Sequence, residues 1–422
     1  MPRVSTRLDA DVVIVGAGAA GLAAGIFARR AAPHLRVIVV DGAHKPGAKI
    51  LVSGGSRCNV TNAVVTDRDY NGGRSTIVRR ILRAFPVEAT VAFFRDLGVT
   101  LHEEAHGKLF PDSHRARDVL DALLQGLASA GAELRPGHRV RTVTRRESGT
   151  GFDVVTARGP ISCGRVVLAT GGLSLPKTGS DGHGYALARA FGHTIVPTTP
   201  ALVPLCLDQD ASAAWRGNLS GVSHPVHLRV VSDAQRPTHV DGAMLWTHFG
   251  VSGPAVLDAS RHWLRHQIEG RTASLRANLL SDTFETTEAT WLSHALAHPR
   301  QQVGTTLAAL VPAAVADAVL ACVHVSRDRT LADLPREDRR LLLHTLTDWP
   351  LPITGSRGYS YAEVTAGGID LREIDPATMA SRLAGGLHFV GEILDVDGRL
   401  GGFNFQWAWS TAYVCGTSMA GE

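Results

Sequence analysis

The sequence predicts an α/β protein in which a Rossmann-like dinucleotide-binding domain is interrupted by an inserted β-rich domain with a small helical cap. Three observations lead to this prediction. A strand, a glycine-rich turn, a helix and a second strand follow one another in residues 11–41, further segments of the same type return near residue 400, and the stretch between changes from alternating to helical periodicity. The 422 residues, 44% of them hydrophobic, suffice for two or three domains with buried cores.

The first element is the apolar run Val12–Val15, which predicts a short buried strand. It leads into GAGAAG (residues 16–21), a G-x-G-x-x-G turn that opens an alanine-rich helix over 22–30. In such a turn Gly16 permits the tight bend, Gly18 lets a pyrophosphate approach the backbone, and Gly21 lets helix and strand pack closely. The free N–H groups and the dipole at the helix N-terminus favour phosphate binding.

The second strand, Arg36–Val40, ends at Asp41, 20 residues after Gly21. A carboxylate at this place accepts hydrogen bonds from an adenosine ribose. Strand, motif, helix, strand and acid occur in register, so the pattern favours a dinucleotide site over an ordinary glycine-rich turn.

Three segments that are far apart in the sequence favour FAD over NAD as the bound dinucleotide. After Asp41 comes GAHKPGAKILVSGGSRCNVTN, which includes Lys49 and resembles the loop under the flavin in two-domain flavoproteins. The buried strand Arg165–Ala169 enters Thr170-Gly171-Gly172, similar to the ATG segment of those proteins. Near residue 400, a strand at 387–390 precedes Gly391-Glu392, and Gly401-Gly402 opens a helix whose N-terminus can stabilise negative charge on the reduced ring.

The electron donor is predicted to be NAD(P)H that binds transiently over the flavin. A second G-x-G-x-x-G after a strand does not occur, so a separate NAD(P)H domain is not expected.

Further segments match one family in order along nearly the whole chain. They are SGGSRCNVTN (53–62), GKLFPDSHRA (107–116), LATGGLSLPKTGSDGHGYALA (168–188), PALVPL (200–205), WTHFGVSGPAVL (246–257), and VTAGGI with GLHFVGEILDVDGRLGGFNFQ (364–406). With these segments the sequence resembles the BaiN/RdsA family of FAD-dependent oxidoreductases. It departs from the family at Ser56, usually glycine, at Lys108, usually arginine, and at Asp181 and His183, in a segment that usually reads TGSTGDGY.

The resemblance implies reduction of a conjugated C=C bond, because the family joins a bile-acid dehydroxylation enzyme with one that forms dihydrouridine in 23S ribosomal RNA. Ribosomal RNA uridine is the favoured substrate. The alternatives are a steroid enone, a small amine in a flavin oxidase reaction, and a non-enzymatic flavin-dependent RNA-binding or assembly role. Four further residues are cofactor-site candidates: Ala20, Val140, Asp395 and Asn404.

The segment SGGSRCN offers several further candidates. Gly54 and Gly55 allow the backbone to pass close beneath a cofactor. Arg57 is a candidate for neutralising the pyrophosphate or the reduced flavin, with a surface arginine as the alternative. Asn59 is a candidate hydrogen-bond partner of the flavin edge, with turn closure as the alternative.

Two side chains are candidate proton donors to the substrate carbon. Cys58 suits this role if it lies beside the flavin near a cation, and its alternative is a small buried packing residue. His248 is the rival candidate because histidine commonly serves as an acid or base near neutral pH, and its alternative is a structural histidine. His102, His106 and His114 show no metal-ligand spacing, so we predict surface histidines and no metal.

The domain boundaries follow the segments. Residues 1–200 and 355–422 form the predicted FAD-binding domain, 201–275 a β-rich substrate domain, and 276–354 a helical cap in which prolines 299, 312 and 335 divide short helices. The five cysteines contain no C-x-x-C pair, and the N-terminal apolar run is too short for a signal or membrane segment. We expect a cytoplasmic protein with a small-molecule or ribosomal RNA substrate, no membrane contact and no stable protein partner.

Overall fold

The structure is a computed structural model that describes residues 8–147, 149–233 and 236–421. The chain forms two compact units. The first unit contains the residues up to Thr198 and those from Glu363 onward, and the second unit contains Thr199–Ala362. Strands and helices of the second unit share one hydrophobic core, so the finer division at residue 275 stays a prediction.

The first unit is built on a sheet of the order β7-β2-β1-β10-β9-β8, with β20 also paired to β10. Strands β7, β2, β1, β10 and β20 run parallel, and β9 and β8 are antiparallel additions. The apolar runs of β1 and β2 are almost wholly buried, as expected for parallel strands covered on both faces. The strands are β1 (Ala10–Val15), β2 (Val37–Val40), β7 (Glu133–Arg135), β8 (Val140–Arg145), β9 (Phe152–Thr156), β10 (Gly159–Leu168) and β20 (Leu387–Phe389).

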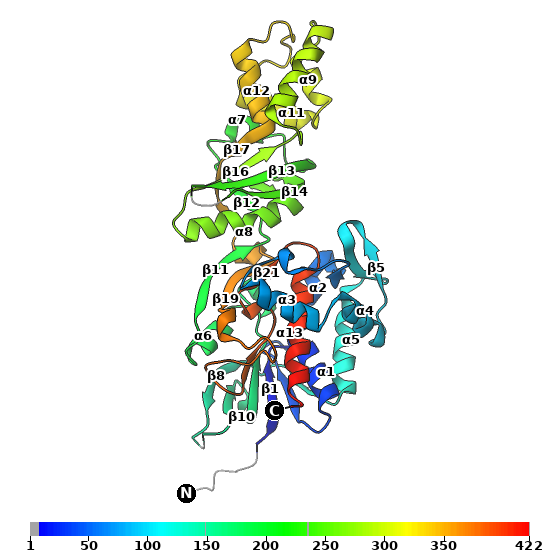
Figure 1. Ribbon diagram of the computed structural model, residues 1–422, viewed down its shortest axis with the longest axis vertical. Coiled ribbons are helices and arrows are strands. Elements are labelled where there is room, and N and C mark those ends of the chain that lie inside the picture. The colour runs from blue at the N-terminus through cyan, green and yellow to red at the C-terminus, as the bar shows by residue number, and fades with distance from the viewer. Residues whose placement is uncertain (1–7, 148, 234–235, 422) are drawn as a thin grey trace. The chain divides into compact units, whose positions relative to one another are not determined.

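Helices α1 and α13 lie side by side in the first unit (Figure 1), where a Cβ atom on Gly416 would be 2.6 Å from Cβ of Phe27. Such close packing joins the first and last helices of the unit. Its helices are α1 (Ala19–Ala31), α2 (Ala48–Ser56), α3 (Ser75–Ala84), α4 (Val87–Asp96), α5 (Ala116–Ser129), α6 (His183–Arg189) and α13 (Phe403–Ser418). Its small strand pairs and ribbons are β3 (Thr61–Asn62), β4 (Tyr70–Gly72), β5 (Leu101–Glu104), β6 (Lys108–Pro111), β11 (Ile195–Ala201), β19 (Val364–Ile369) and β21 (Val396–Gly398).

Helix α13 is held by a buried polar side chain, Gln406, which is 1% exposed. Its Oε1 accepts hydrogen bonds from Thr61 Oγ1 at 2.7 Å and Thr90 Oγ1 at 2.9 Å. Its Nε2 donates to the carbonyl of Phe85 at 2.9 Å and to Ser410 Oγ at 3.1 Å. A buried amide with all its hydrogen bonds made fixes its surroundings, so the start of α13 has a defined place beside β3.

The second unit contains a mostly antiparallel sheet of the order β17-β16-β13-β14-β15-β12-β18. Helix α8 packs on β13, β14 and β16, and helices α9, α11 and α12 gather together (Figure 1). Alternation at 227–231 predicted a strand, which is confirmed within β13. Pro312 and Pro335 directly precede α11 and α12. The elements are β12 (Leu205–Leu207), α7 (Ala213–Arg216), β13 (Ser223–Ser232), β14 (Thr238–Trp246), β15 (Gly250–Ser252), α8 (Pro254–Ile268), β16 (Ala273–Asn278), α9 (Phe284–Ala297), α10 (Val303–Ala308), α11 (Ala313–Cys322), α12 (Arg336–Asp348), β17 (Trp349–Leu351) and β18 (Ile353–Ser356).

Candidate cofactor site

The glycine turn between β1 and α1 has the geometry that a dinucleotide requires. Gly16 has φ of 107°, and a Cβ atom there would be 2.5 Å from the carbonyl oxygen of Ala169. A Cβ atom on Gly21 would overlap the carbonyl oxygen of Gly16. At Gly18, by contrast, no described atom lies within 4 Å of a Cβ position. The open face of the turn is therefore at Gly18, where a pyrophosphate can approach the backbone.

Asp41 is fixed at the end of β2 by two backbone hydrogen bonds. Its Oδ2 accepts from the N–H of Ala17 and its Oδ1 from the N–H of Ala43, both at 2.7 Å. A carboxylate has about four acceptor positions, so two remain for ribose hydroxyls. Val140 begins β8 close by, since the N–H of His138 donates to the carbonyl of Asp41 at 2.7 Å.

Lys49 and Glu392, far apart in the sequence, form an ion pair at this end of the sheet. Ser174 Oγ lies 2.5 Å from Lys49 Nζ and 2.6 Å from Glu392 Oε1. The same oxygen of Glu392 accepts from the N–H of Thr365 at 3.0 Å. Sequence reasoning missed Ser174 and Thr365, because their role depends on partners that only the fold brings near.

Gly391 adjoins the glycine turn. A Cβ atom on Gly391, which has φ of 76°, would lie 2.8 Å from Cβ of Ala20. Its N–H donates to Thr411 Oγ1 at 3.0 Å and its carbonyl accepts from Trp407 Nε1 at 3.3 Å, both on α13. The segment from strand β20 thus meets the start of α1, as the FAD hypothesis requires of one long ligand.

The turn before α13 brings the backbone of two glycines against β3. Gly401 and Gly402 have φ of 132° and 94°, and a Cβ atom on Gly402 would overlap the carbonyl of Thr61. No side chain among the described residues caps α13, so its first N–H groups stay available to a ligand. Asn404 binds both backbone groups of Gly398, which makes it a local brace of this turn.

Asp395 lies outside that turn, just before β21. Its carbonyl accepts from the N–H of Gly73 at 2.8 Å, and its N–H donates to the carbonyl of Ile369 at 2.9 Å. These bonds fix its backbone between two other segments of the first unit.

Buried polar atoms without partners test whether this region fits a cofactor. The Oγ1 atom of Thr170, the Oγ atom of Ser180 and the Oδ1 atom of Asn59 are buried and have no hydrogen-bond partner among the described residues. A Cβ atom on Gly171 would lie 2.5 Å from Ser180 Oγ. Buried polar atoms are normally hydrogen-bonded, so these atoms fit the polar edges of a flavin dinucleotide.

The segment SGGSRCN, predicted as a flexible loop, interrupts helix α2, because Ser53, Gly54 and Gly55 have non-helical backbone angles. It ends helix α2 in a left-handed turn, with φ of 54° at Gly54, 66° at Gly55 and 67° at Ser56. Arg57 forms an ion pair with Glu104 at 2.6 Å, and its guanidinium lies 4.1 Å from the centroid of the Phe110 ring. These contacts favour the structural alternative for Arg57 over pyrophosphate binding.

Cys58 is enclosed by protein atoms and is 0% exposed. Burial raises the pKa of its thiol to about 12, although a hydrogen bond with Ser53 acts in the opposite direction. A side chain enclosed on every side has no surface left for a flavin or a substrate, and a thiol with this pKa is a weak general acid. The structure therefore favours the packing alternative for Cys58.

His248, the other candidate donor, lies in the second unit between β14 and β15. Its side chain is exposed. The ring packs edge-on against Phe249 at 5.1 Å, and the carbonyl accepts a hydrogen bond from Arg216 at 3.3 Å. His248 is thus exposed to solvent.

The three histidines predicted as surface residues without metal-ligand spacing are exposed at His106 and His114 and half-buried at His102. His102 and His114 approach the same carboxylate, that of Glu104, because strand pairing in the β5–β6 hairpin brings them together. His106 is exposed and lies outside this group. The sequence spacing could not show this, since the ligand atoms come from a strand and from a turn beyond the next strand.

Three features place the protein in the class of dinucleotide-binding flavoproteins. They are the glycine turn at residues 16–21, the carboxylate of Asp41 at the end of β2, and helix α13 near the glycine turn. Residues 10–418 match the family described as "HI0933-like protein Rossmann domain". The ribosomal RNA dihydrouridine synthase of Escherichia coli K12 is 36% identical over 405 residues, with 96% of each chain covered. The 3-dehydro-bile acid delta(4,6)-reductase of Clostridium scindens is 32% identical over 410 residues, with 96% of this chain and 98% of that protein covered.

The chain belongs to the HI0933-like family, which confirms the resemblance to BaiN/RdsA proteins. It is an FAD-dependent oxidoreductase by this membership. Among solved structures, the 3-ketosteroid-delta4-(5alpha)-dehydrogenase of Rhodococcus jostii RHA1 is similar over 99% of both chains, with 16% identity and a TM-score of 0.47. In the described part of the chain, no helix combines the length and apolar character needed to cross a bilayer.

Proposed function

We propose that the protein reduces a C=C bond conjugated to a carbonyl with electrons from NAD(P)H, and that its substrate is a uridine in ribosomal RNA. The proposed substrate is supported by similarity over nearly the whole chain to two ribosomal RNA dihydrouridine synthases. The Escherichia coli protein is 36% identical and the Haemophilus influenzae protein is 33% identical. The bile-acid reductase relative supports the reaction class, because a 3-oxo steroid with neighbouring double bonds presents the same conjugated group.

The proposed reaction balances as follows. NAD(P)H gives up a hydride and leaves as NAD(P)⁺, a side chain gives up a proton, and the two add to the two carbons of the double bond. When bound, FAD supplies the carrier that takes up the hydride and passes it on. The products are dihydrouridine and a deprotonated donor that regains its proton from water.

The chain's own residues divide the binding task. The N–H groups after Gly18 bind the pyrophosphate, and Asp41 binds the adenosine ribose. The ion pair of Lys49 with Glu392 fixes the segment from Ser174 against the C-terminal strand, and the N–H groups at the start of α13 offer positive charge to the electron-rich ring. Of the two candidate donors, Cys58 is enclosed and His248 is exposed, so we assign the proton to the imidazole of His248.

The test uses purified holoprotein without oxygen, with NADH or NADPH and ribosomal RNA from a strain in which the gene is deleted. We expect oxidation of the nicotinamide and one new dihydrouridine in 23S RNA, read by mass spectrometry. A parallel arm contains a 3-oxo-4-ene steroid. Turnover of the steroid with unmodified RNA would overturn the RNA substrate and leave the reaction class standing.

The amine oxidase alternative makes the opposite prediction for oxygen. It requires rapid reoxidation of the reduced enzyme in air with release of peroxide, and no need for nicotinamide. A reduced enzyme that is stable in air-saturated buffer excludes it. If neither NADH nor NADPH bleaches the flavin, the reductase proposal itself fails, and the non-enzymatic alternative gains support.

A further inference from the structure

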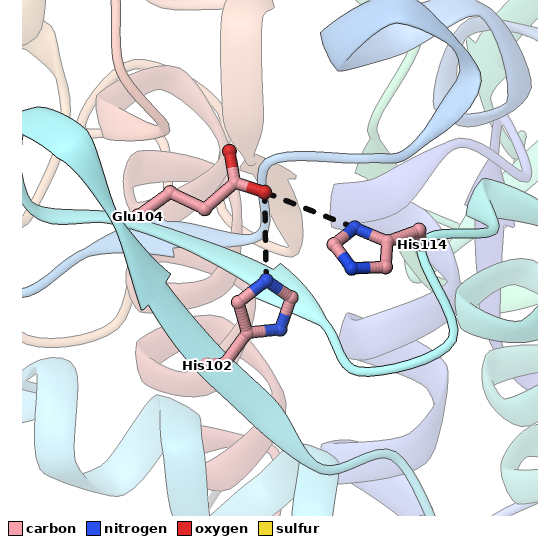
Figure 2. Close-up of side chains that lie close together, drawn as sticks. All are labelled: His102, Glu104 and His114. Carbon is pink, nitrogen blue, oxygen red and sulfur yellow. Dashed lines mark hydrogen bonds and ion pairs between the residues drawn. The ribbon is translucent and has the colours of Figure 1, made fainter.

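A group of metal-binding side chains lies on the β5–β6 hairpin of the first unit, apart from the residues assigned to the cofactor. His102 and Glu104 are two positions apart on β5, so their side chains share one face of the strand. His114 follows β6, in a turn where its N–H donates to the carbonyl of Pro111 at 2.8 Å. Figure 2 shows the two imidazoles directed toward one oxygen of Glu104.

The distances are close to those of a metal site. Glu104 Oε1 lies 3.5 Å from His102 Nε2 and 3.8 Å from His114 Nδ1. All three atoms lie within 4.8 Å of one another. In a tetrahedral zinc site with bonds of about 2.0–2.1 Å, neighbouring ligand atoms stand about 3.4 Å apart. Small side-chain rotations would therefore bring the three atoms to bonding distance of one ion.

Asp112 supplies an independent feature of metal sites. Its Oδ1 lies 3.1 Å from His102 Nδ1, the ring nitrogen away from Glu104. A proton held on Nδ1 by this carboxylate leaves the lone pair of Nε2 free, and a carboxylate behind a ligating histidine is the usual outer support of a metal.

The charges also suit a cation. Arg57 forms an ion pair with Glu104. Two carboxylates, Glu104 and Asp112, thus face one guanidinium and two imidazoles that are neutral when they ligate. Arg57 Nη1 donates to the same Oε1 of Glu104 at 2.6 Å, so the guanidinium and the ion would use the two lone pairs of one oxygen.

We propose that His102 Nε2, His114 Nδ1 and Glu104 Oε1 bind a divalent transition-metal ion, with Zn²⁺ as the best match to two imidazoles and a carboxylate. Water completes the tetrahedron. The ion joins β5 to the turn after β6, and through the bond between Glu104 and Arg57 it also braces the SGGSRCN segment. The proposal does not depend on the substrate of the enzyme.

The test measures Zn²⁺ binding to tag-free holoprotein by equilibrium dialysis. We expect one equivalent to bind to the wild type and to be lost in His102→Ala and His114→Asn. The matched control is His106→Asn, because His106 and His114 both have positive φ, 65° and 52°, on the same hairpin. Asparagine tolerates this conformation, so both variants should fold and keep their flavin.

A further variant tests the outer support. Asp112→Ala should weaken Zn²⁺ binding by roughly 10- to 100-fold, the usual effect of removing such a carboxylate. The proposal is overturned if the wild type binds no Zn²⁺, if the loss is equal in His106→Asn, or if His102→Ala and His114→Asn bind as the wild type does. Flavin absorbance and thermal unfolding of each variant separate a lost ligand from a lost fold.

Discussion

Two glycine-rich turns of the first unit differ in the reason for which they need glycine. In the turn at residues 16–21, the glycines are required by neighbouring atoms, because a side chain on Gly21 would overlap the carbonyl of Gly16. In the turn at residues 53–56, the requirement is the backbone direction, since Gly54 and Gly55 have positive φ, and no described atom lies within 4 Å of a Cβ position on Gly55. Packing alone excludes a side chain at Gly21, and conformation alone disfavours one at Gly55. Gly16, with φ of 107°, and Gly54, where a Cβ atom would lie 2.9 Å from the backbone nitrogen of Asn59, are constrained in both ways.

The difference teaches which functions can be read from a motif. The first turn works through its backbone, so the motif itself states the function. The two reactive side chains directly after the second turn have structural contacts. Arg57 forms an ion pair with Glu104, and Cys58 is part of the hydrophobic core. Their roles depend on partners elsewhere in the fold, which a motif does not contain.

The strongest test of this comparison exchanges glycines within the first turn. Gly21→Val should prevent α1 from packing on the turn and cost at least about 4 kcal/mol, enough to remove folded protein. Gly18→Ala has room in the protein and should fold normally but bind FAD more weakly. Thermal unfolding and flavin content measure both. A stable, yellow Gly21→Val protein would show that the turn is not closed by packing.

The second test asks which of the two candidate proton donors takes part in catalysis: Cys58, just after the second turn, or His248. His248→Ala should lower substrate reduction by roughly 10²- to 10⁴-fold while reduction of the flavin by NAD(P)H stays intact, as for loss of a positioned general acid. Cys58→Ala should turn over substrate at nearly the wild-type rate. Stopped-flow measurement of both half-reactions separates them. A Cys58→Ala protein with the defect predicted for His248→Ala would reverse the assignment.

The third test concerns the carboxylate that serves the first turn. Asp41→Ala removes the acceptor of the Ala17 N–H and of the ribose hydroxyls, and should cost about 1–3 kcal/mol of FAD binding free energy. Flavin fluorescence titration of the apoprotein gives the change in Kd. An unchanged Kd would show that the ribose lies elsewhere.

The smallest expected effect lies in the second turn. Ser56 has φ of 67° and is exposed, at a place where the family usually has glycine. Left-handed backbone costs a non-glycine residue about 1–2 kcal/mol, and the greater flexibility of unfolded glycine offsets about 0.5–1 kcal/mol of the relief. Ser56→Gly should therefore stabilise the protein by about 0–1.5 kcal/mol in urea unfolding. A clear loss of stability would mean that the serine side chain makes a needed contact.

Much of the fold could be predicted because its signals are local. The run at 12–15 lies in β1, the helix expected at 22–30 lies in α1, and the glycines at 401 and 402 directly precede α13. Prolines 312 and 335 mark the starts of α11 and α12, because proline fixes φ and needs no hydrogen-bond partner there.

The rest could not be predicted because it depends on distant pairs. Lys49 and Glu392 are 343 positions apart and meet only when β20 is placed beside β10. The approach of His102 to His114 needs the register of a hairpin and one left-handed residue. The burial of Cys58 follows from packing around a turn whose glycines predicted an open loop.

The first unit is composed of residues from both sides of the second, and this has a consequence for the order of events during synthesis. Residues 199–362 are contiguous and leave the ribosome as one piece, so they can fold while the first unit still lacks β20 and α13. Until Gly391 and Glu392 leave the ribosome, Ala20 in the glycine turn lacks its contact with Gly391, and Lys49 lacks its ion-pair partner Glu392. A nascent chain that ends before residue 363 would therefore contain the dinucleotide-binding turn but would not retain FAD. FAD binding would then be one of the last steps of folding during synthesis.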